Sequence, residues 1–189
     1  MESLDSKFAS ILDLIEHPVA NHHAGDEPVC YLTFDVDEII QVKKNLNTWL
    51  SLAKGKGFNV RIISMVEILN SYFRTNPRRS IWVSSCIGHD KDEIVELFKG
   101  LGSNVQENRV IENAILSAQT EISQKPKPVL IITDLEAIHP FTKFGPIENN
   151  IYNQIKIPVI ILYPGKLDGS SLEFLGIYPP DGNYRSKHF

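Results

Sequence analysis

The stretch YLTFDVDEII, residues 31–40, sets the expected fold of the chain. It begins with apolar and β-branched residues typical of a buried strand, and the acidic residues Asp35 and Asp37 follow at once. Beyond them, apolar residues recur at helical spacing until Gly55, which closes the segment. A strand that runs directly into a long helix is the repeating unit of an α/β fold.

The same alternation of strand and helix continues on both sides of this stretch. Four short runs rich in β-branched or aromatic residues predict strands: Val29 to Phe34, Phe58 to Ser64, Val129 to Thr133 and Val159 to Tyr163. Helical periodicity predicts helices over residues 4–16, 37–53, 65–73, 94–101 (stopped by Gly100 and Gly102), 110–122 and 146–156. Such alternation predicts right-handed crossovers and a parallel sheet.

We therefore predict a single α/β domain over residues 1–189, with a mainly parallel sheet of about four to five strands flanked by helices. The segment SIWVSS, residues 80–85, is open between a fifth strand and an irregular connection, because so short a run has no decisive period. Pro164 and Gly165 predict an abrupt turn. Residues 170–189 are expected to form an edge strand and a tail.

Composition narrows the class of protein. The 189 residues are 42% hydrophobic and 22% charged, as in ordinary globular proteins, and no apolar run approaches the ~20 residues that span a bilayer. The formal net charge of -4 argues against direct nucleic-acid binding by the chain alone. The N-terminus lacks the positive charge of a secretory signal, and Cys30 and Cys86 suggest no disulfide framework. We expect a cytoplasmic protein with free thiols.

Two pairs of acidic residues follow predicted strands: Asp35 with Asp37, and Asp134 with Glu136. In one hypothesis they hold Mg²⁺ at neighbouring strand ends, as in a phosphohydrolase or nuclease-like enzyme. The D-x-D after the first strand superficially resembles the haloacid dehalogenase signature. In the other, Asp35 is the N-cap of the next helix and Glu38 completes a capping box. We favour the second hypothesis, because it accounts for Asp35, Asp37 and Glu38 without a metal.

No phosphate-binding loop accompanies the acids. The strand VLIITDLE is similar to a Walker B strand, yet the pattern G-x-x-x-x-G-K-[ST] is absent from the sequence. The nearest stretch, AKGKGF at residues 53–58, ends a helix instead of beginning one. We therefore expect a Rossmann-like sheet without a P-loop, and no cofactor.

The last third of the chain carries the most distinctive motifs. They are His139, Pro140 and Phe141 after an acid-ended strand, PVIILYPG at 158–165, Gly169, and NYR at 183–185. On these residues the chain resembles the BrxB-like proteins of bacterial BREX phage-defence systems. The resemblance implies an accessory component of a multi-protein antiphage complex, without established catalytic activity. It also implies association with PglZ, which has an alkaline-phosphatase-like domain, and with other BREX components such as a methyltransferase and a large ATPase.

An interaction role requires anchor side chains, which in interfaces are commonly Tyr, Trp and Arg. The candidates are Tyr184, Arg185 and Phe189 near the C-terminus, and the pair Arg78 and Arg79. The alternatives are that Tyr184 and Arg185 only fasten the terminus to the sheet, and that the arginine pair is only solvated. We assign no catalytic, metal or cofactor-binding residue. We expect a non-enzymatic component that binds a PglZ-type protein and positions or regulates it.

Overall fold

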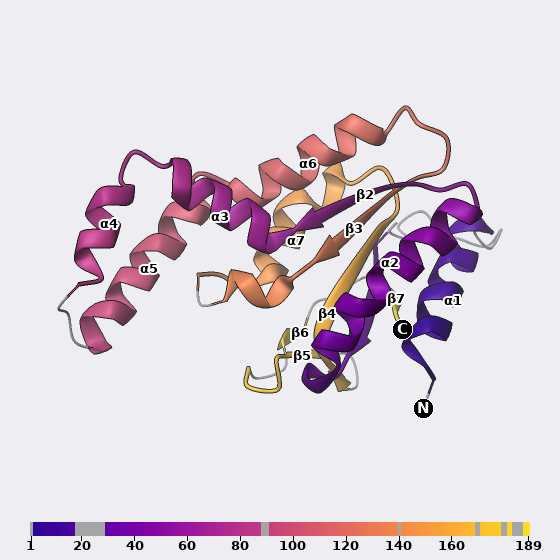
Figure 1. The fold of residues 1–189 in the computed structure, drawn as a ribbon, viewed down its shortest axis with the longest axis horizontal. Coiled ribbons are helices and arrows are strands. Elements are labelled where there is room, and N and C mark those ends of the chain that lie inside the picture. Colours follow the sequence, from indigo (N-terminus) through magenta and orange to yellow (C-terminus); the bar gives the residue numbers. More distant parts are fainter. Residues whose placement is uncertain are drawn as a thin grey trace.

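A parallel sheet forms the centre of the computed structural model (Figure 1). The structure describes residues 2–17, 29–87, 91–139, 141–168, 171–178, 181–182 and 187–189. The main strands lie in the order β2 (Asn59–Ser64), β3 (Pro128–Thr133), β4 (Val159–Asp168), β1 (Val29–Phe34) and β7 (Lys187–His188). Every neighbouring pair in this order is parallel. The predicted α/β fold with a mainly parallel sheet is confirmed.

The strand register brings the carboxyl ends of the strands to one edge of the sheet. Along β1 and β4, Val29 lies beside Val159 and Phe34 beside Pro164. Strands β2 and β3 pair over their full length, from Asn59 to Ser64. The chain segments that follow β1, β2 and β3 therefore all begin at the same edge, where ligands commonly bind in open parallel sheets.

Helices cover both faces of the sheet (Figure 1). The first face is covered by α1 (Leu4–Glu16) and α2 (Ile39–Gly55), and the second by α3 (Met65–Thr75), α6 (Val110–Ile122) and α7 (Phe144–Ile151). Two further helices, α4 (Arg79–Ser85) and α5 (Lys91–Glu107), extend away from the sheet beyond α3. Short 3-10 segments are η1 (Val36–Glu38), η2 (Leu135–Ile138) and η3 (Tyr152–Gln154).

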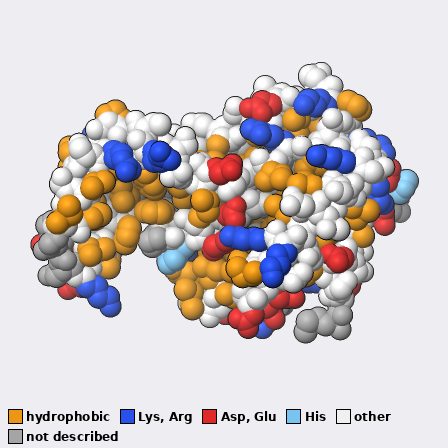
Figure 2. Space-filling model, viewed as in Figure 1, with side chains coloured by type: hydrophobic (Ala, Val, Ile, Leu, Met, Phe, Trp, Pro, Cys, Tyr) orange, Lys and Arg blue, Asp and Glu red, His pale blue; other side chains and the backbone are white. Residues whose placement is uncertain are grey.

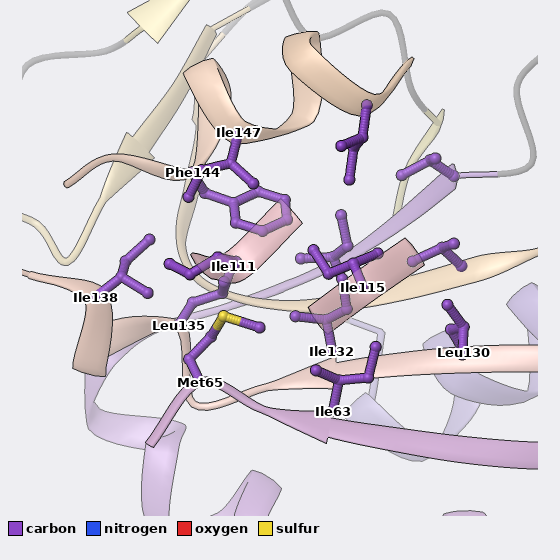
Figure 3. Packing of buried hydrophobic residues seen from close by; sticks show 14 of the residues in the cluster. Ile63, Met65, Ile111, Ile115, Leu130, Ile132, Leu135, Ile138, Phe144 and Ile147 are labelled. Carbon is purple, nitrogen blue, oxygen red and sulfur yellow. The ribbon is translucent and has the colours of Figure 1, made fainter. Parts of the chain in front are cut away.

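Alternate strand residues enter two separate hydrophobic clusters, which is why the strands read as continuous apolar runs. Ile132 and Ile161 face α3, α6 and α7, whereas Ile131 and Ile160 face α1 and α2. Figure 3 shows the first cluster, with side chains from α3, α6 and α7 around those of β2 and β3: Met65, Ile111, Ile115, Phe144 and Ile147 around Ile63, Leu130 and Ile132. The helices are thus fixed to the sheet from both sides.

Residues 80–85 form most of helix α4, so both alternatives drawn from the sequence, a strand and an irregular connection, are wrong. The helix is held by a contact that lies outside its own sequence, because the ring of Trp82 packs edge-on against Phe73 of α3 at 5.8 Å. The turn before it is fixed by the Asn76 side chain, which accepts a hydrogen bond from the Arg78 backbone N–H at 2.9 Å. Tertiary packing therefore determines the helical conformation of this segment.

Helix α5 runs through Gly100 and Gly102, so the predicted stop at these residues is wrong. Gly102 is buried where α5 meets the loop after η2. A Cβ atom at this position would lie 2.1 Å from the Phe141 carbonyl oxygen. Glycine here permits a close approach of two backbones instead of ending the helix.

Strand β4 continues through Pro164 and Gly165, so the predicted turn at these residues is wrong. Beyond the parallel sheet, β4 pairs antiparallel with β5 (Ser171–Phe174), which pairs with β6 (Asp181–Gly182). A Cβ atom at Gly165 would lie 1.8 Å from the Glu173 carbonyl oxygen, which explains the glycine. Within residues 170–189, β5 thus pairs with the extension of β4, and β7 takes the edge position beside β1.

Candidate functional site

Lys43 lies between the acidic side chains that follow β3. The start of α2 places its ammonium group 2.9 Å from an Asp134 carboxylate oxygen and 2.8 Å from a Glu136 carboxylate oxygen. The hydrogen bond to Glu136, and next that to Asp134, raise the pKa of Lys43 against the opposing effect of burial. A fixed positive charge thus occupies the space between these two carboxylates.

Asp134 is the most constrained of the acids. Its second carboxylate oxygen accepts hydrogen bonds from the Ser64 hydroxyl at 2.6 Å and the Thr133 hydroxyl at 2.9 Å. Burial would raise the pKa of Asp134, but the hydrogen bonds from Ser64, Lys43 and Thr133 outweigh it and hold the pKa below its usual value. The backbone is left-handed here, with φ of 59°, which Asp tolerates better than most residues.

The cavity beside this cluster is small. It has a volume of about 40 Å³ and is lined mainly by apolar side chains of β1, α2 and β4 around Lys43 and Asp134. A single water takes up about 30 Å³ in the liquid. The cavity therefore has space for about one water molecule beside the carboxylates.

Asp35 belongs to a separate structure at the end of β1. It occupies the N-cap position of η1, and the Glu38 carboxylate accepts a hydrogen bond from the Asp35 backbone N–H at 3.0 Å in a capping box. Its own carboxylate lies 3.2 Å from the Lys166 ammonium group. Asp37 is exposed in the same turn. The predicted capping role of Asp35 and Glu38 is confirmed.

The four acids do not meet at neighbouring strand ends, as the metal hypothesis requires. Strand β4 lies between β1, which precedes Asp35, and β3, which precedes Asp134. Within the residues that the structure describes, no three His, Cys, Asp or Glu side chains come together as a set able to hold a metal ion. This part of the sequence-based hypothesis is corrected by the strand order, which local sequence does not reveal.

The structure shows what holds His139, one of the residues that carry the family resemblance. The Tyr178 hydroxyl hydrogen-bonds to the ring of His139, and the two rings pack at 4.7 Å. Burial lowers the pKa of His139. Phe174 of β5 lies 6.0 Å from the Tyr178 ring. These contacts fasten the region after β5 to the end of η2.

The predicted interface residues lie in different places. Arg78 and Arg79 are exposed at the junction of α3 and α4. Phe189 is half-buried beside β1, where its backbone exchanges hydrogen bonds with Tyr31 and Thr33 at 3.0 Å each. Tyr184 and Arg185 lie outside the described residues. The interface role of all five residues stays a prediction.

Sequence reasoning missed Lys43 and the exposed apolar side chains of α4 and α5. The available signal for Lys43 is that α2 begins at the carboxyl edge of the sheet, so basic residues in its first turns lie near acids that follow other strands. For the second group, the signal is three consecutive apolar residues, Ile81 to Val83, in a segment too short to be a core helix.

Comparison with known proteins identifies the same family as the sequence motifs in the last third of the chain. None of the described helices is long and apolar enough to cross a membrane. No curated protein and no solved structure is detectably similar to the chain. The model of one family, described as BREX protein BrxB, matches residues 62–189. That match covers most of the fold described above, from β2 to β7, and the chain belongs to the BrxB family of BREX phage-defence proteins.

Proposed function

We propose that the chain is a non-enzymatic component of a BREX phage-defence system that binds a PglZ-type phosphatase-like protein and positions or regulates it. Membership of the BrxB family supports the place in a BREX system. The PglZ-type partner is the one that the resemblance in the last third implies. We further propose that the chain works in the cytoplasm, in contact with other components of the system.

The Lys43 bridge is the observation that carries the non-enzymatic part of the proposal. A carboxylate that binds Mg²⁺ or attacks a phosphate needs a free oxygen and space for the substrate. Asp134 and Glu136 share one ammonium group, and the cavity beside them has a volume of about 40 Å³. This arrangement suits a structural ion pair better than a site for phosphate esters.

The test expresses the tagged chain with the rest of its BREX operon and measures both co-purification of the PglZ-type protein and restriction of phage plating. The variants are Asp35→Asn, which keeps a good N-cap, and Glu136→Gln, which keeps the side-chain shape. We expect both variants to retain complex formation and restriction. The proposal is overturned if the purified chain hydrolyses a phosphate ester with Mg²⁺ and Glu136→Gln abolishes that turnover together with phage restriction.

A further inference from the structure

Strand β2 forms one edge of the sheet, and no described strand pairs with its outer side. The Asn59 backbone N–H donates a hydrogen bond at 2.9 Å to the Lys127 carbonyl oxygen, just before β3, so the backbone groups of Asn59 point toward β3. Every second residue follows this direction, and the backbone groups of Val60 and Ile62 therefore point outward. They form no hydrogen bond with any described residue. Such a row of free donors and acceptors is a template for a further strand.

The chain covers the opposite edge of the sheet, where β7 lies beside β1. Open edges are commonly protected from strand addition by a proline, a bulge or a charged side chain. Strand β2 contains no proline, and it pairs with β3 without a bulge from Asn59 to Ser64. Its one charged residue is Arg61. Whether the edge is protected therefore depends on the direction of the Arg61 side chain.

Arg61 points over a face of the sheet and leaves the edge free. Its guanidinium group lies 3.2 Å from the Glu121 carboxylate of α6, the helix that covers the second face. Figure 2 shows basic and acidic side chains next to one another on the surface where β2 and α6 lie in Figure 1. Side chains of a strand stand roughly perpendicular to the sheet, whereas a further strand would bond in its plane. The Arg61 charge is thus already balanced and does not oppose strand addition.

The side chain of Ile62 gives this edge an apolar centre. Val60 packs against the cluster under α1 and α2, and Ile63 is buried in the cluster under α6. Ile62 is partly exposed and belongs to neither cluster. A β-branched side chain at this position can pack against a residue of a strand added beside it.

Opposite charges at the two ends of β2 indicate what the edge holds. Lys54 and Lys125 are exposed where β2 begins, because Lys54 ends the preceding helix and Lys125 precedes Pro126, whose carbonyl oxygen accepts a hydrogen bond from the Asn59 side chain at 2.5 Å. Glu67 is exposed where β2 leads into α3. None of these three charged groups forms an ion pair with a described residue. An antiparallel second copy would bring the basic end of each edge beside the acidic end of the other.

We propose that two copies of the chain pair through the outer edges of β2, antiparallel about a two-fold axis at Ile62. The sheet then continues from one copy into the other, with Ile62 beside Ile62 of the second copy and Val60 beside its Ser64. Arg61 and Glu121 of both copies lie on one face and balance each other. An extended segment of another protein could use the same backbone groups, but the second copy brings the matching order of charges by symmetry. This inference goes beyond the proposed function and does not depend on it.

The experiment introduces Ile62→Cys into the full chain that carries Cys86→Ser, because Cys86 is exposed whereas Cys30 is buried. In the proposed pairing, the two Cα atoms at position 62 lie about 5.5 Å apart, within the range of roughly 4.4 to 6.8 Å that a disulfide spans. The control is Ile40→Cys in the same background, since Ile40 of α2 is 62% exposed. After mild oxidation, we expect at least about tenfold more covalent dimer from position 62 than from position 40 on non-reducing gels.

Charge variants test the antiparallel direction without touching the strand. Sedimentation of the purified chain over a roughly hundredfold range of concentration gives the dissociation constant of the dimer. Glu67→Lys should raise this constant at least about threefold, because the repulsion occurs twice in a two-fold interface. Adding Lys54→Glu exchanges the two signs and should recover most of the affinity. The control Lys44→Glu, at an exposed position of α2 away from β2, should leave the constant unchanged.

Three results would overturn the proposal. A chain that sediments as a monomer over the whole range forms no dimer, and a dimer in which position 62 crosslinks no better than position 40 uses another surface. In cells that express the BREX operon, crosslinks from position 62 only to a different protein would show that a foreign strand occupies the edge. Each of these results leaves the proposed function standing, because that function is tested by co-purification and phage restriction.

Discussion

At the scale of single residues, Lys43 decides what the carboxylates beside it can do. The capping box of Asp35 and Glu38 is predictable from sequence, because its partners are three residues apart. The bridge from Lys43 to Asp134 and Glu136 is not, because about ninety residues separate the partners and only the packed sheet brings them together. The sequence therefore suggests a metal site at Asp134 and Glu136, whereas the structure shows that both residues form ion pairs with Lys43.

Replacing Lys43 with Met should destabilise the protein by about 1 kcal/mol at pH 7, because two partly buried carboxylates lose their common partner. The value is modest because the Lys43 side chain is 47% exposed. Urea denaturation followed by circular dichroism measures the change. Lys44→Met, at an exposed neighbouring position, should leave the midpoint almost unchanged, and an equal loss in both variants would contradict the role of the bridge.

Asp134 should make stability depend on acid pH. Its folded-state pKa lies below the ordinary 3.8, so its contribution is fully present above pH 3.8 and is lost as pH falls through the lower folded-state value. The variant Asp134→Asn should therefore be less stable than the unmodified chain at pH 5 to 7. The difference should shrink below pH 3.8, and thermal unfolding across this range measures it. A difference independent of pH would show that the carboxylate charge contributes nothing.

At the scale of elements, helical and strand periods locate most segments, but they misplace those that depend on distant contacts. The strand before Asp35 and the long helix after it follow from the local pattern of residues 29–55. Helix α4 depends on the Trp82 contact with Phe73. Helix α5 continues through Gly100 and Gly102, which sequence rules predict to be the end of the helix. Local sequence carries no information on which backbone will approach Gly102.

Two glycines of α5 provide a matched test of this point. At Gly102, a Cβ atom would meet the Phe141 carbonyl oxygen, so Gly102→Ala should cost about 1 to 3 kcal/mol through overpacking. At Gly100, nothing lies within 4 Å of the added Cβ atom. Gly100→Ala should therefore stabilise the helix by about 0.5 to 1 kcal/mol. Thermal unfolding of both variants tests the contrast, and a loss at both positions would contradict it.

At the scale of the whole molecule, the sheet order could not be predicted, although the fold class could. Alternation of strands and helices implies a parallel sheet, but it does not say that β4 enters between β3 and β1, or that β7 closes the edge beside β1. Both facts come from pairing between distant segments. The order of the strands is also what keeps the two acid pairs apart.

Removing residues 187–189 should expose the outer edge of β1. The Thr33 backbone N–H would lose its bond to the Phe189 carbonyl oxygen at 3.0 Å, and the Thr33 hydroxyl would lose its bond to the same oxygen at 2.6 Å. We expect a loss of about 1 to 3 kcal/mol in urea denaturation. Amide exchange should accelerate at Thr33 but stay slow at Leu32, which faces β4 instead. Unchanged protection at Thr33 would contradict this role of the terminus.

The two hydrophobic clusters described above share none of their buried side chains, because alternate strand residues point to opposite sides. Their energetics should therefore be additive. Truncating Leu12 of α1 and Ile115 of α6 to Ala in one chain should cost the sum of the separate losses to within about 0.5 kcal/mol, since the two side chains belong to different clusters. Each layer of the molecule can accordingly drift in sequence without compensating changes in the other.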